Sequence, residues 1–282
     1  ENSASKEKFL EVNLDLPVQQ RRRLQLGLPT LCRSRTSIAE EWPQNSNEVN
    51  APKSKIEIVD PLTHPDYFNV HNLFTVRDLF NARVHYGHKI GSLDERMKPY
   101  IYGSRLGHLI FDLDKTATHL REALNFAAHI AYNDGLILFL YRGALNGHIV
   151  EKTAIECEEF SHTRYWRGGV FTNAKVQFKA VTRLPDLCIF FNTLNNVMTQ
   201  HTAVRDSAKM SIPTIGVVDT NCNPNLITYP VPGNDDSRPS IELYCRVFKE
   251  AIMRGKAKRK EHMEILERQD AQDSNDEMIG KI

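Results

Sequence analysis

Short apolar runs alternate with longer segments of helical pattern from residue 108 onward, and this alternation limits the folds that the chain can adopt. The strand-sized apolar runs span residues 108–113, 135–141, 186–192 and 212–220. The helical segments span residues 114–133, 146–160, 195–210 and 240–260. Strands that are apolar on both faces and separated by helices are typical of a parallel sheet covered on both sides. We therefore expect an α/β fold with three layers, α/β/α, flavodoxin-like or Rossmann-like with a mainly parallel sheet, over residues 65–255.

The two ends of the chain differ in composition from this alternating region. Residues 1–64 mix charges of both signs with Ser, Asn, Gln and Pro, so we expect an irregular extension with at most a short helix at 19–26. Residues 256–282 are first basic and then acidic, and we expect a C-terminal extension in which the last helix frays. Near the start of the folded region, Thr75 is expected to cap a helix whose apolar stripe continues to Val84.

Charge, cysteine usage and hydropathy argue against a strongly basic nucleic-acid-binding protein, a disulfide-bonded protein and a membrane-spanning protein. The formal net charge is +1, so any binding to nucleic acid has to rest on local basic patches. The 5 cysteines are scattered without a paired motif, which is typical of free thiols in a reducing compartment. The longest apolar run, residues 136–141, is too short to cross a membrane, so no membrane partner is expected. The sequence begins with Glu1 rather than Met, and we expect a preceding segment, either a cleaved targeting segment or the rest of a longer sequence.

The predicted carboxyl ends of the strands, where α/β folds bind ligands, carry neither of the two glycine-rich phosphate-binding motifs. Asp112 and Asp114 could be metal ligands, but we interpret Asp112 as a strand end and Asp114 as a helix cap. Asp219, Asn221 and Asn223 could bind a hard cation, although the same pattern is typical of an ordinary turn. We therefore expect no metal and no cofactor.

Other reactive side chains also have structural interpretations. His85 and His88 lack a neighbouring cluster of Cys or carboxylate residues in the sequence and are interpreted as a helix-end pair. Cys157 and Cys188 lie in apolar stretches, which predicts inert thiols. The sequence therefore favours a protein without catalytic residues. The alternative is a flavodoxin-like nucleotide- or metal-binding enzyme that uses Asp112, Asp219 and Asn221 at the sheet edge.

Residues 161–173, SHTRYWRGGVFTN, combine two cations and two large rings with a Gly-Gly pair. Glycine allows close approach of a backbone, while guanidinium groups and aromatic faces suit phosphates and exposed bases. Taken alone, the segment favours a glycine turn around a half-buried aromatic anchor, because surface arginines and buried tryptophans are both common.

Five stretches occur in a fixed order along the folded region. They read ARVHYGHKIGSLDERMKPYIYGSR, FDLDKT, YWRGGVFTN, LPDLCIFFN and IPTIGVVDTNCNPNLITYPVPGNDDS. Together they resemble ribosomal protein two of the small subunit, the universal family that has bacterial members, over about residues 73–255. The resemblance implies a flavodoxin-like α/β/α domain that is a structural and assembly component of the ribosome. It also implies contacts with small-subunit rRNA and with neighbouring ribosomal proteins.

The chain departs from the bacterial pattern in ways that resemble a mitochondrial member of the family. Bacterial members insert a long helical hairpin where only residues 174–183 stand here, so we expect this fold to lack that insertion. Near-neutral charge and added extensions agree with a mitochondrial member. The resemblance therefore implies a place in the ribosome of the mitochondrial matrix, a role in mitochondrial translation, and no homo-oligomer.

We expect rRNA binding mainly through phosphate contacts, which position a protein without reading sequence. Leu93, Asp94 and Glu95 stand where the family usually has Trp-Asn-Pro, so no RNA contact is expected there. The family's Arg-Trp-Leu-Gly-Gly is replaced by Tyr165 to Gly169, in which Trp166 is a packing or stacking anchor. The candidate RNA-binding residues are His88, Lys89, Arg96, Lys98, Arg105, Arg164, Trp166, Arg167, Lys256, Lys258, Arg259 and Lys260.

Overall fold

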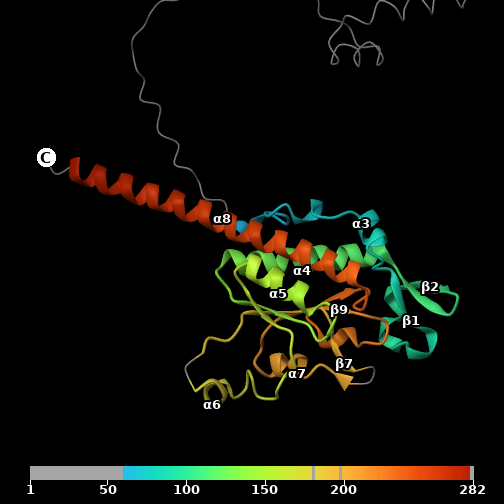
Figure 1. Ribbon diagram of the computed structural model, residues 1–282. Coiled ribbons are helices and arrows are strands. Elements are labelled where there is room, and N and C mark those ends of the chain that lie inside the picture. The colour runs from blue at the N-terminus through green and yellow to red at the C-terminus, as the bar shows by residue number, and fades with distance from the viewer. Residues whose placement is uncertain (1–59, 180–181, 197–198, 280–282) are drawn as a thin grey trace, which may run out of the picture. The chain divides into compact units, whose positions relative to one another are not determined.

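The computed structural model describes residues 60–179, 182–196 and 199–279, all within one compact unit (Figure 1). The helix expected at 19–26 lies outside the described residues. Within the described part of the chain, no helix is both long and apolar enough to span a membrane.

The centre of the fold is a five-stranded sheet with the strand order β10-β9-β6-β4-β5. All four strand pairs are parallel, as the register pairs Ile137 with Leu187 and Val231 with Val217 illustrate. The strands are β4 (Ile137–Leu140), β5 (Phe160–His162), β6 (Leu187–Phe190), β9 (Thr214–Val218) and β10 (Tyr229–Pro232). The prediction of a mainly parallel sheet is confirmed.

Helices cover both faces of this sheet and give the predicted three layers (Figure 1). Successive residues of one strand point to opposite faces, so Phe139 and Phe191 enter one core while Leu140 and Phe190 enter the other. The first core is covered by α4 (Leu113–Tyr132), α5 (Gly147–Glu156) and α8 (Arg238–Ile279). The second core is covered by α7 (Thr202–Lys209) and by the segment that contains Trp166 and Phe171. Helix α6 (Ala174–Phe178) follows this segment and has no buried residue.

Helices α4 and α8 pack closely because small residues face each other at their contact. A Cβ placed on Gly255 would lie 2.4 Å from the carbonyl oxygen of Ala128 and 3.1 Å from the Cβ of Ala131. The N-cap of α4 is Asp112, whose side chain accepts from the Asp114 backbone N–H at 3.2 Å. The interpretation of Asp114 as the cap is therefore wrong by two residues, since Asp114 lies in the first helical turn. Helix α8 continues to Ile279, through the tail in which we expected the last helix to fray.

The apolar run at 108–113 does not belong to the parallel sheet, contrary to its place in the predicted alternation. It forms β3 (His108–Phe111), the central strand of an antiparallel sheet with β1 (Tyr86–Lys89) and β2 (Ile101–Arg105). Leu106 and Gly107 have positive φ angles of 51° and 78° and join β2 to β3 in a two-residue turn. Such turns match the twist of antiparallel strands, which explains the hairpin.

Three further boundaries differ from the sequence-based expectation. The helix expected over 195–210 begins only at Thr202, after the short strands β7 (Leu194–Asn196) and β8 (Thr199–Gln200). The helix expected over 146–160 ends at Glu156, before the edge strand β5. Strand β10 was not predicted because it contains Pro230 and Pro232, which are tolerated only at the edge of a sheet.

The capping role of Thr75 is confirmed. Helix α3 (Val76–Asn81) starts with a capping box in which Thr75 and Asp78 exchange side-chain and backbone hydrogen bonds. It ends earlier than its apolar stripe suggests, because Arg83 adopts a positive φ of 61°. The remaining helical turns are 3-10 helices at Pro61–Thr63, Val70–Asn72, Ile90–Ser92, Glu95–Tyr100 and Pro224–Leu226.

Candidate functional site

The first group of candidate RNA-binding cations lies on the antiparallel sheet and the 3-10 helix that precedes β2. Lys89, Arg96, Lys98 and Arg105 are all exposed. Lys98 forms an ion pair with Glu95 at 3.2 Å. Among the described residues, no hydrogen bond or ion pair engages the side chains of Lys89, Arg96 or Arg105. We call these four residues the hairpin cations; three of them are available to a phosphate without breaking an internal contact.

The second group lies between β5 and α6, where one buried ring fixes a short exposed segment. Trp166 is 2% exposed, and its Nε1 donates to the carboxylate of Asp206 at 3.1 Å. Its ring also lies edge-on to Phe171, with ring centroids 4.8 Å apart. Arg164 and Arg167 on either side are exposed. Burial of Trp166 favours its packing role over stacking on a base, and the two arginines beside it remain exposed.

The third group of candidate cations lies on α8, and most of its side chains already form ion pairs with carboxylates of this chain. Lys256 lies 2.7 Å from Glu159 and donates to the carbonyl oxygen of Cys157 at 2.6 Å. Lys258 pairs with Glu261 at 2.7 Å, and Arg259 pairs with Asp134 at 2.8 Å. Lys260 is exposed and has no ion pair with any described residue. The contacts of Lys256 and Arg259 tie α8 to the residues that follow α5 and α4.

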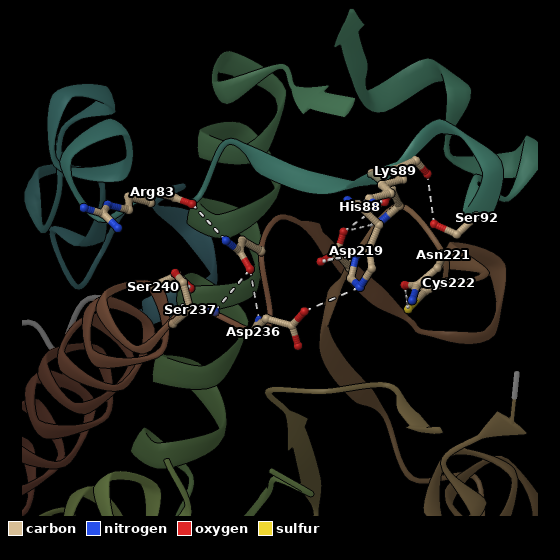
Figure 2. Close-up of polar contacts among 12 residues, drawn as sticks. Arg83, His88, Lys89, Ser92, Asp219, Asn221, Cys222, Asp236, Ser237 and Ser240 are labelled. Atoms are coloured by element: carbon tan, nitrogen blue, oxygen red, sulfur yellow. Dashed lines mark hydrogen bonds and ion pairs between the residues drawn. The ribbon is translucent and has the colours of Figure 1, made fainter. Parts of the chain in front are cut away.

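A fourth group of polar residues lies at the carboxyl end of β9, and the sequence analysis did not predict that its members meet. Figure 2 shows His88 of β1 between Asp219, which follows β9, and Asp236, which follows β10. His88 Nδ1 lies 3.1 Å from Asp219 Oδ2, and His88 Nε2 lies 3.4 Å from Asp236 Oδ2. Asp219 is 1% exposed. Its hydrogen bond to His88 raises the imidazole pKa, and partial burial opposes this effect. We call His88, Asp219 and Asp236 the histidine–aspartate cluster.

Backbone contacts hold the three segments of this cluster together. The His88 N–H donates to Thr220 Oγ1 at 3.0 Å. A Cβ on Gly87 would lie 2.5 Å from Thr220 Cγ2, so only glycine lets β1 approach this closely. Asn234 donates to the carbonyl oxygen of Arg83 and accepts from the Asp236 N–H at 3.0 Å. The cluster is therefore positioned by contacts between residues about 150 positions apart.

This geometry changes the interpretation of the two histidines and agrees with the turn interpretation of Asn223. His85 and His88 are not a helix-end pair, because α3 ends at Asn81 and the two rings have different neighbours. His85 stacks on Phe80, with centroids 4.5 Å apart, whereas His88 faces carboxylates. Asn223 caps a 3-10 helix, as the turn interpretation of this stretch predicts. Asp236 was missed because nothing in the sequence indicates that PGNDD returns to the end of β9.

The cysteines named as possible nucleophiles are buried. Burial raises the pKa of the Cys157 thiol to about 11 and that of the Cys188 thiol to about 12. The raised pKa favours the protonated thiol at neutral pH, which agrees with the interpretation of both cysteines as structural residues.

Comparison with known proteins identifies the family. The model of the family described as "Ribosomal protein S2" matches residues 79–189 and 175–255. The chain belongs to this family. The match spans both the antiparallel sheet and the parallel sheet. Family membership supports a ribosomal protein, and no comparison supports the alternative of an enzyme.

Relatives resemble the chain over most of their length. The small ribosomal subunit protein uS2m of Bos taurus is 58% identical over 214 residues, which are 76% of this chain and 73% of the relative. Small ribosomal subunit protein uS2 of Rickettsia bellii is 31% identical over 224 residues, covering 64% of this chain and 76% of the relative. The corresponding protein of Wolbachia pipientis is 32% identical over 221 residues, covering 64% and 82%.

Proposed function

We propose that the chain is a structural component of the small subunit of the mitochondrial ribosome, located in the mitochondrial matrix. The observation that carries this proposal is the 58% identity to the bovine protein named as a small ribosomal subunit protein uS2m. Association with small-subunit rRNA and with ribosomal proteins follows from this family. The chain would then serve subunit assembly and translation by binding, without a catalytic step.

We place the main rRNA contacts on Arg164, Arg167 and the hairpin cations. Phosphate binding needs cations that can reach the ligand, and Arg164 and Arg167 are exposed beside the rigid Trp166 anchor. His88 is a weaker candidate because both ring nitrogens face carboxylates.

The α8 cations are proposed to contribute less to RNA binding. Lys256, Lys258 and Arg259 are each neutralised by a carboxylate, so an RNA phosphate would have to displace an existing ion pair. Lys260 alone among these four is exposed without such a pair in the described chain. We further propose that residues 1–64 and 256–282, on either side of the domain at 65–255, bind neighbouring ribosomal proteins.

Replacement of both arginines beside Trp166 tests the proposed RNA contact. The double variant Arg164→Gln, Arg167→Gln is expected to lower the fraction of chain incorporated into small subunits by several-fold at equal expression. For the purified full chain binding small-subunit rRNA, the logarithm of affinity falls linearly with the logarithm of salt concentration. The double variant should make this dependence shallower, by about 1–2 in slope, because fewer counterions are released when a phosphate contact is lost.

Lys152→Gln is the matched control. Lys152 is also an exposed cation, but it lies on α5, outside the proposed RNA interface, and its ion-pair partner is Glu156 of the same helix, at 3.9 Å. This variant should keep normal incorporation and an unchanged salt slope. Normal incorporation and salt slope of the double arginine variant would remove both residues from the proposed interface.

A further inference from the structure

We propose that Tyr165 and Arg142 form a platform on which one unpaired base of the small-subunit rRNA stacks. This inference rests on the proposed function and adds base stacking to the phosphate contacts placed on Arg164 and Arg167. We call Tyr165 and Arg142 the tyrosine platform. The guanidinium carbon of Arg142 lies 4.9 Å from the centre of the Tyr165 ring. Since Tyr165 is nevertheless 69% exposed, the guanidinium covers one face of the ring and leaves the other open to solvent.

The tyrosine platform lies at the edge of the parallel sheet where α/β folds bind ligands. Arg142 follows β4 and Tyr165 follows β5, and these two strands are parallel neighbours. Both residues therefore lie beyond the carboxyl ends of their strands, which is the side of an open α/β sheet that receives ligands. The next residue, Trp166, is buried and bonded to Asp206, so the chain beside the exposed ring is anchored in the second core.

The charges around the tyrosine platform favour a polyanion. Arg142, Arg164 and Arg167 form no ion pair with any described residue. The Nη1 atom of Arg142 is buried and has no hydrogen-bond partner in the described part of the chain. Two carboxylates bond to the same segment, but Glu151 and Asp206 accept from other side chains of it and not from these arginines. Three guanidinium groups thus surround one exposed aromatic face without a neutralising acid.

An aromatic face among guanidinium groups fits an unpaired nucleotide better than a duplex. Proteins hold bases from loops, bulges and ends of RNA by stacking them on aromatic rings, while cations bind the adjoining phosphates. Bases inside a helix are covered by their neighbours and cannot reach a ring in this way. Every base has a π-face, so the tyrosine platform should accept any of the four bases. Tyr165 stands where the family usually has arginine, so this stacking face departs from the usual family pattern.

Binding of the purified full chain to small-subunit rRNA separates stacking from phosphate contact. Tyr165→Ala should weaken binding on the order of tenfold, the effect of removing one base–aromatic stack. The dependence of affinity on salt should keep its slope, because this variant removes no phosphate contact. Tyr165→Leu should behave in the same way, since leucine keeps apolar bulk without a π-face. Tyr165→Phe keeps the ring and should bind like the unmodified chain.

Phe80→Ala is the matched control. Phe80 is also an exposed ring, at 59%, with one face stacked on His85 at a centroid distance of 4.5 Å. It lies on α3, outside the tyrosine platform, and no exposed guanidinium contacts its ring among the described residues. This variant should bind small-subunit rRNA with unchanged affinity.

The outcomes distinguish this inference from the proposed function. Unchanged rRNA affinity of Tyr165→Ala, or a shallower salt dependence in that variant, would overturn the tyrosine platform while the chain still sediments with the small subunit. Poorer incorporation of Tyr165→Ala into subunits at unchanged rRNA affinity would assign the ring to a protein neighbour and would also overturn it. An unmodified chain that neither binds small-subunit rRNA nor sediments with the small subunit would overturn both the inference and the proposed function.

Discussion

Trp166→Ala is expected to lower the free energy of unfolding by about 3–5 kcal/mol, the range for removing a large buried aromatic side chain. The ring is 2% exposed and lies at the centre of the second core, against Phe171 and His162. Its removal leaves a cavity and also deprives the buried carboxylate of Asp206 of the indole N–H. Urea denaturation followed by far-UV circular dichroism measures this loss.

Tyr165→Ala is the control for this variant. Tyr165 is the adjacent ring but is 69% exposed, and its main contact is Arg142, whose guanidinium carbon lies 4.9 Å from the ring centre. The expected cost is below about 1 kcal/mol, typical of an exposed cation–π contact. Equal destabilisation by the two substitutions would contradict the assignment of Trp166 as the anchor of this segment.

Acid is expected to destabilise the protein through His201, starting near pH 6.5 and continuing toward pH 4. His201 is 2% exposed and caps α7, where Nδ1 accepts from the Ala203 N–H at 3.2 Å. Burial, and then the charges of Arg142 and His162, lower its pKa to about 4 from 6.5. The unfolded chain therefore takes up the proton first, so this contribution to stability is complete above pH 6.5 and is lost as the pH falls. The shift corresponds to a loss on the order of 3 kcal/mol.

His201→Asn separates this effect from the titration of carboxylates. Asparagine keeps a side-chain acceptor at the N-cap and does not titrate, so the variant should lose less stability between pH 6.5 and pH 4. His148→Asn, at an exposed position of α5, should follow the unmodified chain. The measurement is the free energy of unfolding in urea across this pH range. Parallel curves for His201→Asn and the unmodified chain would show that His201 does not carry the acid response.

The parallel sheet could be predicted because its strands are buried on both faces, which leaves continuous apolar runs such as residues 186–192. The same signal misled the assignment of residues 108–113, because an apolar run does not reveal the direction of its neighbours. The two-residue turn at Leu106 and Gly107 was the available indication of a hairpin. Strand β10 was hidden by its two prolines.

Candidate cations could be chosen from the sequence, but their availability could not. Lys256 is paired with Glu159, which is 97 positions away, and only the packing of α8 on the parallel sheet reveals that contact. The histidine–aspartate cluster likewise draws its members from the ends of β1, β9 and β10. Each member alone has an ordinary structural interpretation, and the folded backbone is what brings them together.

Sedimentation of mitochondrial lysate through a sucrose gradient, with this chain and small-subunit rRNA followed in each fraction, is the most direct test of a ribosomal role. With magnesium, the chain should migrate with the small subunit and the intact ribosome. After magnesium is removed, it should leave the position of the intact ribosome and remain with small-subunit rRNA. A slowly sedimenting pool without any rRNA-bound fraction would contradict the proposed function.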